Sequence, residues 1–200
     1  MRRIILATKN DGKIKEVKAM LEDLKIEILS LNDYKNLPEI KEDGKSFFEN
    51  ALKKAKIISE HTGEMVLSDD SGLEVKYLGG EPGIYSARYS GRDATDSSNI
   101  KKLLESLEGV PIEKRGASFR CVLVLYRSDG KHWEFEGVLN GIINDKPIGD
   151  AGFGYDPVFF LPELGLTVAQ LSPNMKNKIS HRAQAVDKFK EAYKRKVFLR

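Results

Sequence analysis

The sequence has one cysteine, a nearly balanced charge and no long hydrophobic run. Because Cys121 is alone, it cannot form a disulfide within the chain or a cysteine-based zinc cluster. We expect it to be a small buried thiol in a protein of a reducing compartment. No stretch approaches the roughly 20 apolar residues of a transmembrane helix, and the apolar run after the first two arginines is too short for a signal peptide. We therefore expect a cytoplasmic protein without a membrane partner.

The charge also limits the class of partner. Lys and Arg number 33 and Asp and Glu number 30, which gives a formal net charge of +3. This balance does not by itself indicate nucleic acid, so we expect no stable nucleic-acid partner. The basic residues gather at 188–200, which form either a solvated helix face or a tail that binds polyanions. A length of 200 residues with 40% hydrophobic composition indicates a globular protein over residues 1–200, either one large domain or one domain with two lobes.

Apolar spacing along the chain predicts an α/β protein with a mixed sheet. Strand patterns occupy residues 4–7, 26–29, 65–67, 117–127, 131–143 and 158–160, and helical patterns occupy 14–24, 46–58, 93–107 and 181–194. Ser128-Asp129-Gly130 is a hairpin signal between the two longest strands. Ser46 and Glu49 form a predicted capping box, and Ser180 is the predicted cap of the last helix. Ligand sites in such sheets gather where strands end in loops.

The loop at residues 8–13 follows the first strand and precedes a helix. Its side chains supply a hydroxyl, an amide and two ammonium groups, and a helix N-terminus favours an anion. The stretch is therefore either a phosphate-binding loop or an ordinary turn in which Asn10 or Asp11 caps the helix. It is not a Walker loop, because the G-x-x-x-x-G-K-[ST] pattern is absent.

Two adjacent carboxylates, Asp69 and Asp70, follow the apolar residues 65–67, where we expect the strand to end. Like charges side by side need water, a compensating partner or a cation, and Mg²⁺ prefers carboxylate oxygens. One carboxylate would hold the metal while its neighbour, or the same group, activates a water. The alternative is a turn held by Asx hydrogen bonds, with a positive φ at Gly72.

Other polar residues could complete such a site. Glu42 and Asp43 offer a further oxygen ligand or are two solvated loop acids. Arg88 suits a phosphate or an aromatic ring, and residues 153–156 offer aromatic faces beside a glycine. Lys54 has two lysine neighbours, and periodicity does not decide which of them faces a site. His181 and Arg182 begin the last helix, where the helix dipole disfavours positive charge, and such a broken rule is typical of functional sites.

Six motifs in this order resemble the inosine triphosphate pyrophosphatase family, in its bacterial and archaeal form. They are T-x-N-x-x-K at 8–13, F-x-E-N-A at 47–51, SDDSGLEV at 68–75, GIYSARYSG at 83–91, FGYDPVFF at 153–160 and ISHR at 179–182. The resemblance spans almost the whole chain. It implies a long curved mixed β-sheet flanked by helices, with two lobes around a central active-site cleft, and a homodimer.

The resemblance further implies Mg²⁺-dependent hydrolysis of ITP, dITP and XTP to the monophosphate and pyrophosphate. Asp70 would be the catalytic proton acceptor, and Glu42 and Asp70, with Asp69 as a further candidate, would bind the metal. Substrate-binding residues would be Thr8, Lys9, Asn10, Asp11, Gly12, Lys13, Lys54, Ser71, Arg88, Phe153, Gly154, Tyr155, Asp156, Lys176, His181 and Arg182. Two alternatives remain: a Maf-type pyrophosphatase acting on pyrimidine or modified nucleotides, and a non-catalytic module that binds nucleotides or nucleic acid.

Overall fold

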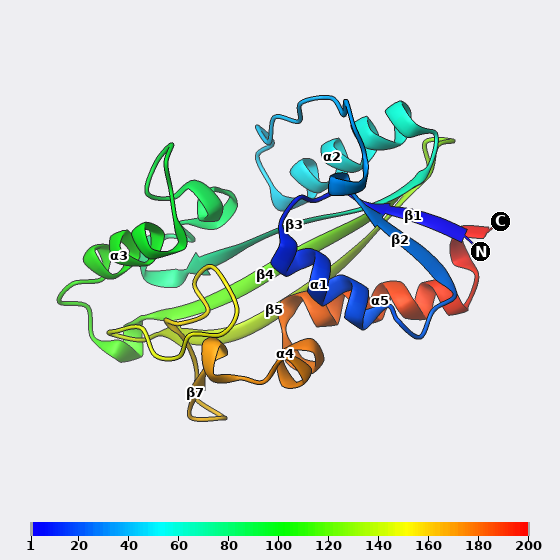
Figure 1. The fold of residues 1–200 in the computed structure, drawn as a ribbon. Helices are drawn as coiled ribbons and strands as arrows, with labels where there is room; N and C mark the ends of the chain where they lie inside the picture. The colour runs from blue at the N-terminus through cyan, green and yellow to red at the C-terminus, as the bar shows by residue number, and fades with distance from the viewer. Residues whose placement is uncertain (1, 200) are drawn as a thin grey trace. The chain divides into compact units, whose positions relative to one another are not determined.

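The computed structural model describes residues 2–199 (Figure 1). The helices are α1 (Asp11–Met20), α2 (Phe47–Thr62), α3 (Asp96–Ser106), α4 (Pro173–Ile179) and α5 (His181–Lys194). The strands are β1 (Arg2–Leu6), β2 (Ile26–Ser30), β3 (Met65–Val75), β4 (Gly116–Tyr126), β5 (His132–Ile143), β6 (Phe159–Leu161) and β7 (Leu166–Thr167). Among the helices within residues 2–199, none combines the length and the apolar character that a bilayer crossing requires.

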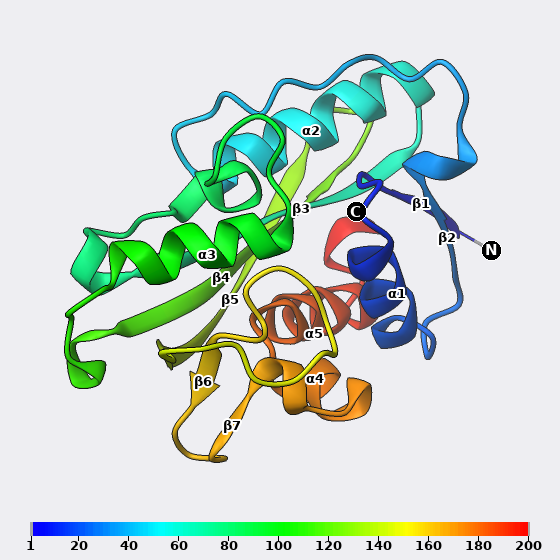
Figure 2. The same cartoon turned by 60° about the vertical axis from the view of Figure 1, so that its left-hand side comes forward.

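The seven strands form one open sheet in the order β2-β1-β3-β4-β5-β6-β7. β1 pairs in parallel with both β2 and β3, whereas β5 and β6, and β6 and β7, pair antiparallel. The sheet is therefore mixed and flanked by helices, which confirms the expected α/β class (Figures 1 and 2).

Contacts along the chain divide it into two compact units. Unit 1 contains residues 1–70, 121–137 and 181–200, and unit 2 contains residues 71–120 and 138–180. The long strands β3, β4 and β5 each contribute residues to both. The predicted site residues are therefore distributed over both units.

In unit 1 the core joins the first strands to the last helix. α1 and α5 lie side by side in both views (Figures 1 and 2). Ile4, Leu6 and Leu67 of the sheet pack with Val17 of α1 and Phe189 of α5 in one buried cluster, to which Cys121 also belongs. The expectation of a buried thiol is confirmed.

A glycine lets α5 approach the sheet closely. A Cβ added at Gly137 of β5 would stand 2.0 Å from the His181 carbonyl oxygen and 2.8 Å from the Ala185 nitrogen. The absence of a side chain at Gly137 therefore fixes where the first turn of α5, with His181 and Arg182, can lie.

Unit 2 has its own core. Leu73 and Val75 of β3 pack with Leu103 of α3 and with Phe119 and Phe159, whose rings stack with their centroids 4.3 Å apart. This core supports the loop between β5 and β6, which carries residues 153–156.

The predicted β4–β5 hairpin is confirmed, but the predicted end of β3 is wrong. β3 continues without a break from Met65 to Val75, through both aspartates, and Gly72 does not have a positive φ. The Asx-turn alternative with a positive φ at Gly72 is therefore excluded. The carboxylates stay in the strand because side chains from elsewhere in unit 1 compensate their charge.

Further differences concern short elements and caps. The sequence patterns missed α4 and β7. At the start of α2, the Ser46 hydroxyl accepts a hydrogen bond from the Glu49 N–H as predicted, at 3.1 Å. The Glu49 carboxylate, however, accepts from the Lys45 N–H at 2.8 Å. Only half of the predicted capping box is therefore present.

Candidate active site

The loop at residues 8–13 begins the site in unit 1. Thr8 Oγ1 accepts a hydrogen bond from the Asn10 N–H at 3.1 Å, and Asn10 Oδ1 accepts from the Lys13 N–H at 3.0 Å. Asn10 is thus the N-cap of α1. Lys9, Asn10 and Asp11 are exposed at this helix N-terminus. The cap and a phosphate-binding role are compatible, because one side chain satisfies only one of the free N–H groups of the first turn.

Asp69 is fully buried and lies among cations. Its Oδ2 is 2.8 Å from Lys13 Nζ and 3.3 Å from Arg182 Nη2, while Arg182 Nη1 is 2.6 Å from Glu16 Oε2. Arg182 is itself only 1% exposed. Two cations and two carboxylates from α1, β3 and α5 therefore form one buried charge network in unit 1, in which opposite charges compensate one another.

Asp70 lies in a different environment, beside α2. Its Oδ2 accepts a hydrogen bond of 3.0 Å from Asn50 Nδ2. Lys54 follows Asn50 by one helical turn, is buried, and donates from Nζ to Glu42 Oε1. The structure therefore distinguishes the candidate lysines. Lys54 is buried and pairs with the half-buried Glu42, whereas Lys53 pairs with Asp43.

The two neighbouring aspartates have opposite pKa shifts. Burial works to raise the pKa of Asp69, but Lys13, Arg182 and Lys54 outweigh it and hold that pKa well below its usual range. Burial raises the pKa of Asp70 to about 6, with help from the charge of Glu42 and against Lys54 and the Asn50 hydrogen bond. Asp69 is thus a permanent anion, and Asp70 is a carboxylate that can exchange a proton near neutral pH.

The cations of unit 1 keep their charge. Burial works to lower the pKa of Lys54, but Glu42, Asp69 and Asp70 outweigh it and raise that pKa above its ordinary value. Burial likewise opposes the charge of Arg182, and Asp69 and Glu16 outweigh it and raise its pKa. Both side chains therefore remain positively charged in unit 1.

A cavity of about 480 Å³ opens beside these residues in unit 1. Thr8 and Lys9 line it from the loop after β1, and Glu42 and Lys54 line it from the opposite elements. With Glu39, which also lines it, two cations and two carboxylates face a space large enough for several phosphate groups.

A hard cation needs few protein carboxylates, and unit 1 offers few. Among residues 2–199, no three His, Cys, Asp or Glu side chains converge on a point that could hold an ion. Mg²⁺ is commonly held by one or two carboxylates together with waters and substrate phosphates. A buried Asp70 whose pKa is raised in part by Glu42 fits this smaller donor set, because a cation would relieve the repulsion between the two groups.

In unit 2 the predicted residues 153–156 form a second polar cluster with Lys176. Asp156 is 3% exposed, and its Oδ2 accepts from the Phe153 N–H at 3.0 Å and from Lys176 Nζ at 2.6 Å. Lys176 Nζ also lies 4.5 Å from the centroid of the Phe153 ring. The Gly154 N–H donates to Asp96 Oδ2 at 2.7 Å. These bonds hold the Phe153 ring, which is partly exposed, as a fixed aromatic face.

Tyr155 differs from its neighbours. Its ring belongs to the core of unit 2, and its hydroxyl donates to the Ser86 carbonyl at 2.8 Å. Burial raises the pKa of the hydroxyl above its ordinary value. Tyr155 therefore fixes the loop, whereas Phe153 is the ring available for stacking.

The remaining predicted residues lie elsewhere in their units. Ser71 is the residue of β3 directly after Asp70. Arg88 lies over the Tyr85 ring, 5.1 Å from its centroid, in a separate depression of about 660 Å³. His181 is buried at the start of α5, next to Arg182. A substrate contact at each of these positions remains a prediction.

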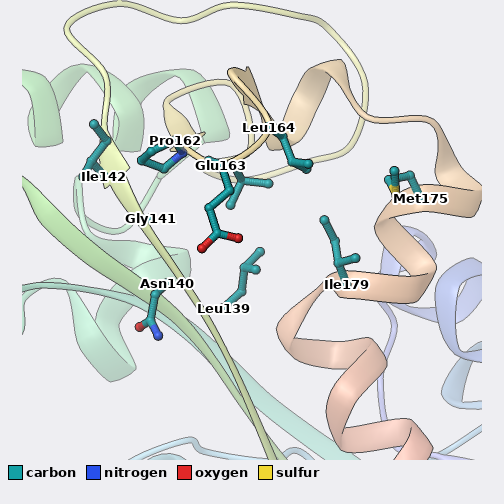
Figure 3. Close-up of a pocket in the computed structure, with 10 residues that line it drawn as sticks. Leu139, Asn140, Gly141, Ile142, Pro162, Glu163, Leu164, Met175 and Ile179 are labelled. Atoms are coloured by element: carbon teal, nitrogen blue, oxygen red, sulfur yellow. The ribbon is translucent and has the colours of Figure 1, made fainter.

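Another pocket of unit 2, of about 600 Å³, has mainly apolar walls (Figure 3). Leu139, Leu164, Met175 and Ile179 surround the side chain of Glu163, which points into it (Figure 3). None of the predicted site residues lines this pocket. The predicted substrate-binding residues of unit 2 therefore lie outside this pocket.

Sequence reasoning missed two residues of the unit 1 site, Glu16 and Asn50. Glu16 follows Lys13 by three residues, so both side chains lie on one face of α1. Asn50 stands in the quoted F-x-E-N-A motif, between the buried residues Phe47 and Lys54. A polar residue on the buried face of a helix was the available signal, since such a group needs a partner.

Comparisons with known proteins agree on one family. The dITP/XTP pyrophosphatase of Geobacter sulfurreducens is 50% identical over 191 residues, which cover 96% of each chain. That of Bacillus licheniformis is 51% identical over 188 residues, covering 94% of this chain and 96% of the relative.

Solved structures lead to the same result. The structure of a HAM1 protein from Coxiella burnetii matches with a TM-score of 0.90 and 40% identity, over 98% of this chain and 100% of that one. A Ham1 protein from Staphylococcus aureus matches with a TM-score of 0.87 and 38% identity, over 96% and 98% of the two chains. The resemblance drawn from the six motifs is confirmed. Since a model of the Ham1 family also matches residues 4–192, this chain belongs to the Ham1 family.

Proposed function

We propose that this chain hydrolyses dITP, ITP and XTP to the nucleoside monophosphate and pyrophosphate, as one catalytic domain over residues 1–200. The observation that carries the proposal is the environment of Asp70. It is a buried carboxylate with a pKa raised to about 6, and Lys54, whose charge acts on it, lines the cavity together with Thr8 and Lys9. The names of the relatives, dITP/XTP pyrophosphatase, support the same reaction.

The residues of unit 1 suit the triphosphate. The exposed N-terminus of α1 offers backbone N–H groups and the positive end of a helix dipole. Lys9 and Lys54 add positive charge at the cavity, and Lys13, held by Asp69, adds a third ammonium on the same loop. Fixed positive charge stabilises the negative charge that develops on phosphate oxygens in the transition state.

Asp70 suits the role of proton acceptor. At neutral pH it is ionised, since its pKa is about 6, and the Asn50 amide fixes one of its oxygens. In this assignment Asp70 accepts a proton from the water that attacks the α-phosphorus, in line with the departing pyrophosphate. Asp69 remains ionised and holds Lys13 and Arg182 in place.

We propose Mg²⁺ as the cofactor, held by Glu42 and Asp70; Asp69 is the poorer ligand candidate, because it is fully buried and pairs with Lys13 and Arg182. When bound, the ion would neutralise phosphate charge and lower the pKa of a bound water. The proximity of Lys54 to Glu42 means that the ammonium already neutralises part of this donor set. Lys54 can therefore turn toward a phosphate when a cation replaces it beside Glu42.

We propose that Phe153 and Lys176 contact the base in unit 2, and that His181 and Arg182 contact the substrate in unit 1. Hypoxanthine and xanthine carry a 6-keto acceptor where adenine carries a 6-amino donor. A site whose cations donate to that position leaves a donor unsatisfied when adenine binds, at a cost of about 1–3 kcal/mol. This cost corresponds to a preference of about 5- to 150-fold.

We also propose that the protein works as a homodimer in the cytoplasm. The resemblance to the family supports both statements, and the buried single thiol is compatible with a reducing compartment. Light scattering on the purified chain tests the first, since a monomeric mass at micromolar concentration contradicts it.

Pyrophosphate release from dITP, ITP, XTP, ATP and GTP, measured with and without Mg²⁺, tests the proposed function. We expect turnover of the first three nucleotides that depends on the metal and much lower kcat/KM for ATP. Release of orthophosphate in place of pyrophosphate, or equal turnover of ATP, would contradict the assignment.

A further inference from the structure

The side chain of Asn50 joins two parts of unit 1 through one amide. Its Nδ2 donates to Asp70 Oδ2 at 3.0 Å, and its Oδ1 accepts from the Gly44 N–H at 2.8 Å. Asn50 is 1% exposed, so neither bond competes with bulk water. Gly44 lies two residues after Glu42, in the loop that precedes α2. One buried amide thus contacts both the catalytic candidate and the loop of the second carboxylate.

The orientation of this amide follows from its neighbours. A backbone N–H can only donate, so it must face the amide oxygen, and an ionised carboxylate can only accept, so it must face the amide nitrogen. No other side chain of similar size supplies a donor and an acceptor in this arrangement. Aspartate retains only the acceptors, and leucine retains the shape without either function.

Two ion pairs hold the same loop against α2. Lys54 contacts Glu42 and Lys53 contacts Asp43, so residues 42, 43 and 44 each bind a side chain of the helix. Figure 2 shows the loop running alongside α2. A Cβ added at Gly44 would stand 2.7 Å from Asn50 Oδ1, so the backbone approaches the amide as closely as a glycine allows. The loop therefore packs directly against the Asn50 side chain.

We propose that Asn50 is a positioning residue, whose amide holds the Asp70 carboxylate and the loop carrying Glu42 in one fixed arrangement. The inference rests on the proposed function, in which these two carboxylates serve one metal ion. Asn50 acts through Asp70 and Gly44 and touches neither substrate nor metal. Outer partners of this kind, when removed, typically cost about 10- to 100-fold in metal affinity or activity.

Two substitutions separate the two bonds. Asn50→Asp keeps an acceptor for the Gly44 N–H and replaces the donor to Asp70 with a second carboxylate that repels it, so the loop stays in place while Asp70 loses its fixed position. Asn50→Leu loses both bonds and keeps the number and branching of the side-chain heavy atoms. Ser59→Ala is a matched control, because Ser59 is a fully buried residue of the same helix whose hydroxyl donates to the Glu64 carbonyl at 2.7 Å, away from the carboxylates.

The experiment measures three properties of the full chain. The first is kcat and KM for dITP as a function of Mg²⁺ concentration. The second is hydrogen–deuterium exchange of residues 36–46, and the third is Mn²⁺ affinity by calorimetry without nucleotide. Thermal unfolding of each variant shows that the measured fraction is folded.

For both Asn50 variants we expect kcat to fall about 10- to 100-fold, half-saturating Mg²⁺ to rise and KM for dITP to change less than about threefold. Loop exchange should increase in Asn50→Leu only, and Mn²⁺ affinity should fall about 10- to 100-fold in that variant. Ser59→Ala should lower the unfolding temperature and change none of the three properties.

Opposite results would overturn the inference. If folded Asn50→Leu kept the wild-type kcat and Mg²⁺ dependence, or if its loop exchanged as in the wild type, Asn50 would have a structural role alone. If the wild-type chain released no pyrophosphate, the proposed function would fail. Mn²⁺ affinity and loop exchange would then still test the positioning role of Asn50. If the wild type did not bind Mn²⁺, that role would be excluded.

Discussion

Adjacent aspartates of β3 should respond in opposite directions to the same substitution. Asp69 and Asp70 are both buried, and aspartate-to-asparagine exchange removes the charge of either one with almost no change in volume. The pKa of Asp69 is held low by cations, so folding favours its charged form. The pKa of Asp70 is raised, so folding disfavours its charged form. Asp69→Asn should therefore destabilise the protein at neutral pH, and Asp70→Asn should stabilise it.

The magnitude for Asp70→Asn follows from the shift in pKa. A rise from 3.8 to about 6 corresponds to about 3 kcal/mol, at about 1.4 kcal/mol per pKa unit. Because the folded pKa is raised, the favourable contribution of the protonated carboxyl is complete below about pH 3.8 and is lost as pH rises through about 6. Wild type and Asp70→Asn should thus unfold alike near pH 4, and the variant should be more stable by up to about 3 kcal/mol at pH 8.

Asp69→Asn should have the opposite effect on stability. Because the pKa of Asp69 is lowered by folding, its charged form stabilises the protein above the unfolded pKa, and only strong acid removes this contribution. The substitution should therefore destabilise the protein over the whole range from pH 5 to 8. Removing one partner of a buried ion pair typically costs about 3–5 kcal/mol, here because Arg182 and Lys13 both lose the charge of Asp69.

Thermal and urea unfolding in EDTA at pH 4 and pH 8 tests both expectations. A chain of this size changes its unfolding temperature by about 2–4 °C per kcal/mol. Loss of stability in both variants, or a gain in Asp70→Asn that is the same at pH 4 and pH 8, would refute the assignment of opposite environments. Pyrophosphate release should be lost in Asp70→Asn despite its higher stability, which separates catalysis from folding.

Three further outcomes follow from the geometry. Gly137→Ala should destabilise the protein by about 1–3 kcal/mol or more and impair turnover, because the added Cβ would stand 2.0 Å from the His181 carbonyl oxygen. Gly116→Ala is the control: the nearest atom to its added Cβ is 3.5 Å away, so unfolding and activity assays should show little change. Lys176→Met should lower the unfolding temperature, since buried Asp156 loses its cation, and should raise KM for XTP more than it lowers kcat. Half-saturating Mg²⁺ should rise about tenfold per pH unit below about pH 6, because Asp70 must release its proton to bind the ion, and a pH-independent value would contradict its role as a ligand.

Local patterns were sufficient for the longest elements of the fold. The β4–β5 hairpin has long apolar strands and a short turn at residues 128–130, so both signals agree within about thirty residues of sequence. α4 was missed because seven residues are too few to show helical periodicity. Its start nevertheless carries a recognisable signal, since Ser172 caps the helix and Pro173 occupies the first turn.

The error at β3 has a different cause. Two adjacent carboxylates resemble the end of a strand when only neighbouring residues are considered. The groups that keep them in the strand are distant in sequence: Arg182 lies 113 residues after Asp69, and Asn50 lies 20 residues before Asp70. No local pattern contains these partners, so the strand boundary, Glu16 and the function of Asn50 became visible only in three dimensions.

An unbroken strand is also what gives the two aspartates separate functions. Successive side chains of a strand point to opposite faces, so the charges that are neighbours in sequence are separated by the sheet. Asp69 meets the cations of α1 and α5, and Asp70 meets Asn50 and Lys54 of α2. A turn at this position would place both carboxylates in one environment, where each would raise the pKa of the other. Because the pleat separates them, one carboxylate stays ionised and fixes the cations, while the other is held near the pKa that a proton acceptor requires at neutral pH.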